Sequence, residues 1–235
     1  TTGSDARQMI WDNVEGFRRA AEFARLSGTP LIYASSAAIY GVCHSGRMQE
    51  DQAARPANVY GFSKTLLENL ARRYTDTSGG CRAVGLRYFN VYGPGEVHKG
   101  AAASMIYQLA EQIRAGKRPR IFKYGEQQRD FVYVKDVVDA TLLAADANHS
   151  GVYNVGSGRP TSFNEVVALL NKALGTDHDP DYFDNPYPFY QPHTEADVTR
   201  ARAELGYVPK YPIDRGIAEY AKRLMEVGLM QHELS

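Results

Sequence analysis

A tyrosine and a lysine stand four residues apart in the segment NVYGFSK, which covers positions 58–64. Apolar residues at positions 62, 66, 67 and 70 predict an amphipathic helix that starts near Tyr60. Residues four apart lie on the same face of a helix, so Tyr60 and Lys64 are expected to be neighbours. An ammonium group beside a phenol stabilises the phenolate, which suits proton transfer to and from a substrate hydroxyl. The same spacing also occurs on solvated helix faces, so the pair alone leaves both interpretations open.

A short apolar run precedes this helix and ends in two hydroxyl side chains. Residues 31–36 read LIYASS, and AAIYG follows directly. This pattern is typical of a buried parallel strand, and ligands of open α/β sheets bind at the carboxyl ends of such strands. The sequence therefore predicts that Ser36 lies near a ligand at the edge of a parallel sheet.

Serine, tyrosine and lysine in this order, on a strand and the helix after it, resemble the catalytic set of the short-chain dehydrogenase/reductase family. The segments SSAAIYG and YGFSK resemble its extended branch, the nucleotide-sugar epimerases and dehydratases. This resemblance implies that Tyr60 is the acid/base, that Lys64 holds the nicotinamide ribose and supports the tyrosine, and that Ser36 orients the substrate hydroxyl. It also implies NADP or NAD as the cofactor.

Two further segments extend the resemblance. LRYFNVYGPG at positions 86–95 is similar to the R-x-F/Y-N-x-Y-G-P segment of the extended branch. The similarity implies that Val91 faces the nicotinamide amide and that Asn90 donates to the diphosphate of a sugar nucleotide. RDFVYVKDV at positions 129–137 is similar to the branch's R-D-F-V-Y-V-x-D-V segment. It implies that Arg129 binds the nucleotide, a role that suits a bidentate guanidinium.

Weaker similarities assign further cofactor and substrate contacts. DNVEG at positions 12–16 resembles the N-N-V-x-G helix start of the branch, which implies that Asn13 supports the cofactor site. The first asparagine of that pattern is replaced by Asp12. Phe122 begins FKYG, where the branch has a nucleotide-binding F-E-G-S loop. Phe122 is therefore assigned to substrate binding.

A lysine after the Gly-Pro turn narrows the resemblance. NVYGP followed by HKG at positions 98–100 resembles one subfamily, the ADP-glycero-manno-heptose 6-epimerases, in which that lysine is a second base. The matching residue is Lys99, and such a role needs a lysine that is desolvated. Tyr190 stands where the subfamily has a substrate-contacting tyrosine. Ala101 replaces a serine and Gln108 replaces a histidine of that subfamily.

The predicted reaction is NAD(P)-dependent epimerisation of a nucleotide-activated sugar, by transient oxidation and re-reduction. Two bases, Tyr60 and Lys99, would serve the two faces of the reacting carbon. The resemblance favours ADP-glycero-manno-heptose as the substrate. A UDP-sugar 4-epimerase needs no counterpart of Lys99 and is the first alternative. A non-catalytic NADP-binding or oligomerisation module on the same fold is the alternative from another class.

A nucleotide-sugar 4,6-dehydratase is disfavoured. Enzymes of that kind carry an Asp-Glu pair directly after the strand's hydroxyl residue, and the pair eliminates water. Here Ala37 and Ala38 occupy these two positions.

The first half of the chain alternates between helix and strand patterns. Helices are expected over about 5–26 and 60–75, with strands at 31–36 and 81–89. The resemblance implies a doubly wound, Rossmann-like parallel sheet. No strand pattern runs into G-x-G-x-x-G or G-x-x-G-x-x-G, so the dinucleotide fingerprint is absent from this chain and the Rossmann sheet is expected to be N-terminally incomplete.

A smaller C-terminal α/β domain is expected to bind the substrate. We assign residues 1–93 and 131–158 to the dinucleotide-binding domain, and residues 94–130 and 159–235 to the substrate domain. A helix over about 102–115 belongs to the second.

Two helix starts and one irregular segment are expected further along the chain. Asp136 is expected to cap a helix that ends near position 148. Ser162 is expected to cap the next helix, with Glu165 completing a capping box. Residues 177–193 are rich in Pro, Tyr and Asp and are expected to form an irregular segment over a ligand.

Composition limits the partners. Lys plus Arg and Asp plus Glu balance at 27 each in 235 residues, so no excess charge favours nucleic acid or an anionic membrane. The chain has no long apolar run, and its two cysteines, Cys43 and Cys81, lack metal-ligand spacing, so no metal site is predicted. We expect a cytoplasmic homo-oligomer that binds a nucleotide-diphosphate sugar, and neither nucleic acid nor a membrane.

Overall fold

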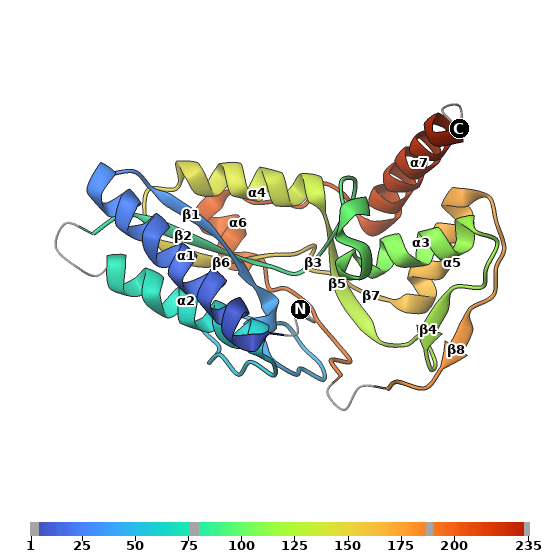
Figure 1. Cartoon of the computed structure of the whole chain (residues 1–235), viewed down its shortest axis with the longest axis horizontal. Coiled ribbons are helices and arrows are strands. Elements are labelled where there is room, and N and C mark those ends of the chain that lie inside the picture. Colours follow the sequence, from blue (N-terminus) through green and yellow to red (C-terminus); the bar gives the residue numbers. More distant parts are fainter. Residues whose placement is uncertain (1–4, 76–79, 187–189, 233–235) are drawn as a thin grey trace.

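The computed structural model describes residues 5–75, 80–186 and 190–232 of the chain (Figure 1). Its helices are α1 (Ala6–Ser27), α2 (Val59–Thr75), α3 (Met105–Arg114), α4 (Val134–Asp146), α5 (Phe163–Leu174), α6 (Thr199–Leu205) and α7 (Ile213–His232). Its strands are β1 (Leu31–Ser36), β2 (Ala83–Tyr88), β3 (Asn90–Tyr92), β4 (Arg120–Phe122), β5 (Gln128–Tyr133), β6 (Gly151–Val155), β7 (Pro160–Ser162) and β8 (Asp181–Phe183). Two short 3-10 helices are η1 (Ala37–Tyr40) and η2 (Val97–Ala102). None of the helices within the described ranges combines the length and apolar character that a membrane crossing requires.

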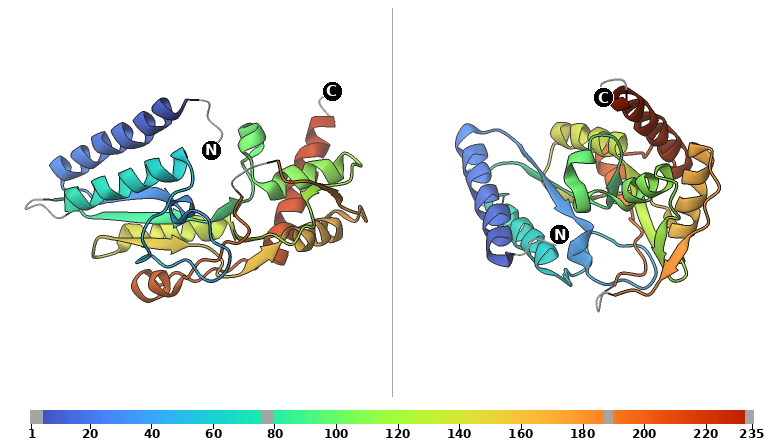
Figure 2. Two further views of the ribbon diagram at one scale, coloured as in Figure 1. Left: turned by 90° about the horizontal axis from the view of Figure 1, so that it is seen from below. Right: turned by 45° about the vertical axis from the view of Figure 1, so that its right-hand side comes forward.

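A parallel sheet with the order β1-β2-β6 forms the first part of the molecule. Helices α1 and α2 cover one face of the sheet, and α4 and α6 cover the other (Figure 2). Alanines and aromatic rings pack under α1 and α2, among them Phe17 and Tyr33, whose ring centroids lie 5.1 Å apart. Small side chains such as Ala140 and Ala144 let α4 approach Val84 and Leu86 of β2 closely. The predicted doubly wound arrangement of parallel strands between helices is thereby confirmed.

Shorter strands and helices α3, α5 and α7 form the second part, on the right in Figure 1. Strand β3 pairs in parallel with β5, β5 pairs antiparallel with β7, and β4 pairs in parallel with β8. Helices α3, α5 and α7 share one apolar cluster with Tyr92, Phe131 and Tyr133. Ala201 and Leu205 of α6 instead pack with the first sheet. The exact domain boundaries stay a prediction.

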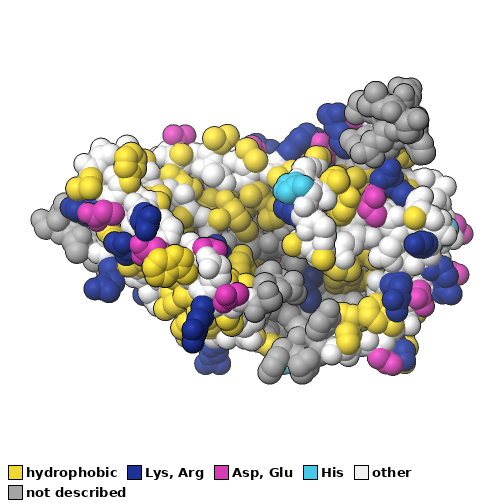
Figure 3. All heavy atoms as spheres, in the orientation of Figure 1, with side chains coloured by type: hydrophobic (Ala, Val, Ile, Leu, Met, Phe, Trp, Pro, Cys, Tyr) yellow, Lys and Arg dark blue, Asp and Glu magenta, His cyan; other side chains and the backbone are white. Residues whose placement is uncertain are grey.

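Charged side chains are mixed on the molecular surface. On the face shown in Figure 3, basic and acidic groups lie interspersed. Helix α1 carries the ion pairs Arg18–Glu15 and Arg25–Glu22. Both pairs are exposed, so each contributes little to the free energy of folding.

One predicted helix start is confirmed and two differ from expectation. Ser162 caps α5 by accepting from the backbone N of Glu165 at 3.1 Å, but the Glu165 carboxylate binds Arg159 and does not close a capping box. The expectation that Asp136 caps α4 was wrong, because the N-cap residue is Tyr133. Asp136 lies inside the first turn, and its carboxylate accepts from the backbone of Lys210 and Tyr211. Helix α3 begins at Met105, since η2 occupies the preceding residues.

Asp130 of β5 joins three segments of backbone. The side chain is fully buried and accepts from the backbone N and hydroxyl of Ser157, at 2.6 and 2.7 Å. It also accepts from the backbone N of Gly158 and of Ala196, each at 2.9 Å. Both carboxylate oxygens are therefore needed to satisfy buried donors.

Asp130→Asn is expected to lower the free energy of unfolding by about 3 kcal/mol, because an amide offers one acceptor oxygen and turns its own donors toward buried N–H groups. Urea unfolding of the two proteins measures this change. Asp146→Asn, at an exposed position of α4, is the matched control and should change the value by less than about 0.5 kcal/mol. Equal effects of the two substitutions would contradict the account.

Candidate active site

A cavity of about 900 Å³ is lined by residues from both parts of the molecule, a size within the range of small-molecule sites. The carboxyl end of β1, the start of α2 and strand β3 line it from the first sheet's side, and η2, α3, β4 and β5 line it from the other. It brings together these residues predicted from the sequence: Ser36, Tyr60, Asn90, Val91, Lys99, Phe122, Arg129 and Tyr190. Lys64 and Asn13 are not among the described residues that line the cavity.

Strand β1 delivers Ser36 to the cavity while its neighbour Ser35 points the other way. Successive side chains of a strand alternate between its two faces. Ser36 Oγ accepts from the backbone N of Ala38 at 3.1 Å and so caps η1. Because the oxygen accepts this bond, its hydroxyl hydrogen is available for a ligand. Ser35 is buried and donates to Glu68 of α2.

Glycine 61 explains how α2 comes so close to the end of β1. A Cβ atom at Gly61 would lie 2.5 Å from the carbonyl oxygen of Ala38, nearer than packed atoms allow. Only glycine therefore permits this approach, which brings the start of α2, with Tyr60, to the same cavity as Ser36. The first turn of α2 is held by Asn58, whose Oδ1 accepts from the backbone N of Gly61 at 2.8 Å.

Asn13 acts on the site through α2. Its Nδ2 donates to Ser63 Oγ at 2.9 Å, and Ser63 Oγ in turn donates to the carbonyl oxygen of Tyr60 at 2.7 Å. Ser63 is fully buried between the two helices. The structure thus places Asn13 against the turn that carries Tyr60, rather than in the cavity itself.

Lys64 turns toward β1 and not outward. Its Nζ donates to the carbonyl oxygen of Ala34 at 3.0 Å and lies 5.7 Å from the centroid of the Tyr60 ring. Burial lowers the pKa of Lys64. Among the residues that the structure describes, no carboxylate forms an ion pair with it. Two of the three ammonium hydrogens therefore remain to bind hydroxyl groups of a ligand.

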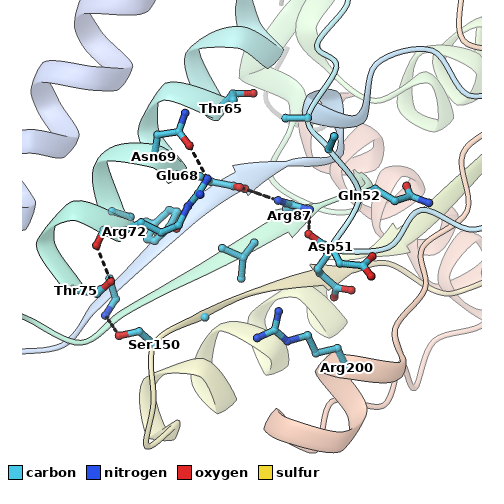
Figure 4. A pocket seen from close by; sticks show the side chains of 18 residues that line it. Asp51, Gln52, Thr65, Glu68, Asn69, Arg72, Thr75, Arg87, Ser150 and Arg200 are labelled. Carbon is cyan, nitrogen blue, oxygen red and sulfur yellow. Dashed lines mark hydrogen bonds and ion pairs between the residues drawn. The ribbon is translucent and has the colours of Figure 1, made fainter.

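A buried ion pair fixes α2 to the sheet behind these residues (Figure 4). Arg87 of β2 donates to both carboxylate oxygens of Glu68, at 3.0 and 2.8 Å, and both side chains are at least 90% buried. Ser35 donates to the same carboxylate, and Arg87 also donates to the Tyr40 hydroxyl at 2.8 Å. The network joins β1, η1, α2 and β2, which together position Ser36 and Tyr60.

Glu68→Gln is expected to lower the free energy of unfolding by about 3–5 kcal/mol, because it leaves the Arg87 guanidinium buried without its counter-charge. The matched control is Glu22→Gln, which breaks an exposed ion pair with Arg25 and should cost less than about 1 kcal/mol. Urea unfolding measures both values. A cost for Glu68→Gln no larger than that of the control would contradict this role.

The far side of the cavity carries a half-buried cation and an aromatic wall. Arg129 of β5 donates to the carbonyl oxygen of Gln128 at 2.8 Å and lies 5.3 Å over the Tyr190 ring. Burial lowers the pKa of Arg129, and no carboxylate in the described part of the chain pairs with it. Phe122 packs edge-to-face on Phe183 and Tyr190, with centroid distances of 4.9 and 5.3 Å. A guanidinium without a carboxylate partner, beside aromatic rings, suits an anionic ligand that carries a planar base. Residues 187–189 of the segment expected to be irregular lie outside the described ranges.

Strand β3 supplies the two residues between these walls. Asn90 and Val91 pair with Phe131 and Val132 of β5, so their backbone is held by the sheet. The Asn90 amide is exposed and its oxygen accepts from the Thr194 hydroxyl at 3.5 Å, a long bond that leaves the amide nitrogen available to a ligand.

Lys99 approaches the cavity on η2. The segment reverses at Gly100, whose φ of 53° favours glycine, and Lys99 precedes this turn. The side chain is exposed and not desolvated, contrary to expectation. Water would have to be displaced from it by a bound ligand.

Two residues of the cavity were missed from the sequence. Glu96 is a buried carboxylate next to η2, and only its position just before the His-Lys-Gly motif could have drawn attention to it. Phe183 lies in β8, within a segment that was expected to be irregular. Its signal was the run Asp181-Tyr182-Phe183, since aromatic residues favour strands.

The chain resembles known proteins along most of its length. The sequence model of the NAD dependent epimerase/dehydratase family matches residues 1–156. The crystal structure of Helicobacter pylori ADP-L-glycero-D-manno-heptose-6-epimerase is 38% identical, with 96% of this chain and 69% of that chain covered and a TM-score of 0.88. UDP-glucose 4-epimerase of Thermotoga maritima is 30% identical, with 95% and 72% covered and a TM-score of 0.85. UDP-N-acetylglucosamine 4-epimerase of Methanobrevibacter ruminantium M1 is 27% identical, with 92% and 69% covered and a TM-score of 0.86.

The matched range contains the positions of Ser36, Tyr60, Lys64 and Lys99. The family is NAD dependent, which confirms the predicted class of cofactor. Because the family match covers more than half of the sequence and agrees with the fold, this chain belongs to the NAD dependent epimerase/dehydratase family, as its motifs predicted.

Proposed function

We propose that the chain carries the active site of a nucleotide-sugar epimerase, and that ADP-glycero-manno-heptose is its substrate. The observation that supports this best is one cavity lined by Ser36 and Tyr60 on one side and by Lys99 on another. Two proton-transferring groups on separate elements suit a reaction that treats both faces of one carbon. The 38% identity to a heptose epimerase agrees with that substrate.

Residues of α2 and β3 fit a nicotinamide cofactor. Lys64 keeps two ammonium hydrogens for ribose hydroxyls, Tyr60 lies a helical turn away, and Val91 lines the cavity beside them. Asn13 supports this group from behind through Ser63. When bound, NADP or NAD supplies the acceptor and donor of the hydride.

The remaining chemistry belongs to the chain's own side chains. Tyr60 takes the proton from the carbinol oxygen of the substrate, and Ser36 donates a hydrogen bond to that oxygen, where charge develops. Lys64 assists from one helical turn away, with its ammonium group 5.7 Å from the centroid of the Tyr60 ring. Lys99 exchanges the proton at the oxygen of the opposite epimer. These roles make Ser36, Tyr60 and Lys99 catalytic residues, assisted by Lys64.

The cation and the aromatic wall would hold the nucleotide. Arg129 can bind the diphosphate through two parallel N–H groups, and the Asn90 amide can donate to the same group. Phe122 and Tyr190 offer ring surfaces for the base and the sugar. The FKYG segment differs from the F-E-G-S loop of the branch, and the comparison of ADP- and UDP-linked sugars below tests which base is bound.

Arg129→Met is expected to raise KM for the nucleotide sugar by about 10- to 100-fold, with a smaller change in kcat, because it removes charge-assisted bonds made in the bound substrate. Steady-state kinetics of the intact protein measures both constants. Arg73→Met, on the exposed face of α2, is the matched control and should leave KM unchanged. A change in kcat alone would contradict diphosphate binding by Arg129.

A comparison of substrates tests the proposed function. The intact protein, with whatever residues flank this chain and with NADP+ or NAD+ added, is incubated separately with ADP-glycero-manno-heptose, UDP-glucose and UDP-N-acetylglucosamine. Conversion of the heptose alone is expected. Conversion of a UDP-sugar alone would make the protein a UDP-sugar 4-epimerase. If no sugar is converted and the protein shows no nicotinamide absorbance, the result would favour a non-catalytic module. Cytoplasmic location and a homo-oligomeric state remain part of the proposal.

A further inference from the structure

A buried carboxylate stands at the base of the segment that carries Lys99. Glu96 is 3% exposed, and its Oε1 accepts from the Ser104 hydroxyl at 2.8 Å and the Tyr220 hydroxyl at 3.1 Å. The same oxygen lies 3.4 Å from the backbone N of Gly93. Its Oε2 accepts from the backbone N of Ser104 at 2.7 Å. The donors come from the turn before η2, from Ser104 at the N-cap of α3, and from α7.

These bonds close the Lys99 segment at both ends. Gly93 precedes residues 97–103 and Ser104 follows them, so one carboxylate joins the two flanks of the loop. Ser104 also caps α3, because its oxygen accepts from the backbone N of Tyr107 at 3.1 Å. Since the single hydroxyl hydrogen of Ser104 goes to Glu96, a lone pair of the oxygen remains for that cap.

The buried carboxylate of Glu96 has no ion-pair partner among the described residues. No Lys, Arg or His in the described part of the chain forms an ion pair with it, and its partners are neutral donors. Burial, with the charge of Glu96 as a further cause, raises the pKa of the Tyr220 phenol, so this hydroxyl stays protonated and donates. A buried carboxylate costs solvation energy, so its presence calls for a gain other than packing.

The backbone at Lys99 is tied to the same residue. The backbone N of Lys99 donates to the carbonyl oxygen of Glu96 at 3.0 Å, and Gln108 of α3 donates to the carbonyl oxygens of Ala101 and Ala103 at 3.3 and 2.9 Å. The Lys99 side chain itself is exposed, so its direction depends on how the short loop is held. Small errors in the position of a proton-transferring group slow a reaction strongly.

We propose that Glu96 is a positioning residue that holds residues 97–104 in the shape that presents Lys99 to the cavity. The proposal rests on the function proposed above in that it takes Lys99 as one of the two bases. The carboxylate acts from beneath the loop, and Tyr220 of α7 fixes the carboxylate in turn. The expected consequence is a loop that loosens, with Lys99 misplaced, when the carboxylate is lost.

Glu96→Gln tests the proposal in the intact protein. An amide has one acceptor oxygen and would turn its own donors toward the N–H and hydroxyl groups that Glu96 accepts from. Hydrogen exchange of the amides over 97–104 is expected to rise by about 10-fold or more. The kcat for epimerisation is expected to fall by about 10-fold or more, while KM for the nucleotide sugar changes by less than about 3-fold, because a positioned base acts in the transition state.

Asp136→Asn is the matched control. Asp136 is a carboxylate that is 1% exposed, and it accepts from the backbone of Lys210 and Tyr211, neither of which is a partner of Glu96. It should leave both the exchange of 97–104 and kcat unchanged, even though it lowers stability. Tyr220→Phe, which removes a single hydroxyl, is the second variant and tests the proposal if Glu96→Gln does not fold. In Tyr220→Phe, hydrogen exchange of the amides over 97–104 should rise by about 3-fold.

The outcomes separate this proposal from the function. Faster exchange over 97–104 in Glu96→Gln, with the control unchanged, supports the role of Glu96 in holding residues 97–104 even if the wild-type protein epimerises no sugar. In that case only the proposed epimerase function is refuted. Unchanged exchange over 97–104 in the variants, or a kcat of Glu96→Gln equal to wild type in an active enzyme, overturns the positioning role.

Discussion

Tyr60→Phe is expected to reduce kcat for epimerisation by at least about 10³-fold, because phenylalanine cannot take up or return the proton of the substrate hydroxyl. The loss should appear in kcat more than in KM, since the phenol acts on the reacting oxygen rather than on the nucleotide. The aromatic ring and its packing are retained, so the free energy of unfolding should stay within about 1 kcal/mol of wild type. Steady-state kinetics of the intact protein and urea unfolding measure the two effects.

The control for this variant is Tyr182→Phe. Tyr182 of β8 also loses only a hydroxyl, which donates to Asn164 Oδ1 at 2.9 Å outside the cavity. Its kcat should equal that of wild type. Cofactor binding by Tyr60→Phe should persist, because Lys64 is still held at the carbonyl oxygen of Ala34. Turnover by Tyr60→Phe within 10-fold of wild type would contradict the assignment of the acid/base.

Lys99→Ala is expected to reduce the overall rate of epimerisation by about 10²- to 10³-fold while sparing one half of the reaction. If Tyr60 serves one epimer and Lys99 the other, oxidation of the first epimer needs only Tyr60. Rapid mixing of the variant with each epimer in turn, followed by the absorbance of the reduced cofactor, should therefore show normal oxidation of one epimer and slow oxidation of the other.

The matched control is Lys117→Ala, an exposed lysine in the turn after α3. It should oxidise both epimers as fast as wild type. Equal loss for both epimers in Lys99→Ala would contradict a division of labour between two bases. Unchanged turnover would remove the second base and favour a UDP-sugar 4-epimerase type of mechanism, which needs only Ser36, Tyr60 and Lys64.

The part of the site that the sequence predicted depends on local patterns. The period of three to four after Tyr60 placed the tyrosine and lysine on one helix face, and the apolar run before Ser36 indicated a strand. Both elements formed as expected, at Val59–Thr75 and Leu31–Ser36. Their mutual position could not be read in this way, because it depends on the absence of a Cβ at Gly61 against a carbonyl oxygen at Ala38.

Contacts between distant segments account for what was missed. Asp136 was expected to cap its own helix, but the donors it satisfies come from Lys210 and Tyr211, more than 70 residues away. Glu96 was passed over because one of its partners, Tyr220, stands 124 residues further along the chain. Local propensity says nothing of such partners, which are fixed only when the helices pack. The expectation that Lys99 is desolvated was wrong for the same reason, since its side chain is exposed and no other segment among the described residues buries it.

The most direct test of the central claim follows the hydrogen on the inverted carbon. The intact protein with its nicotinamide cofactor is incubated with ADP-glycero-manno-heptose in deuterated water, and the two epimers are followed by NMR. The account predicts interconversion with the original hydrogen retained at the inverted carbon, because the same hydride is removed and returned while Tyr60 and Lys99 move protons on oxygen only. Deuterium at that carbon, or no interconversion at all, would contradict it.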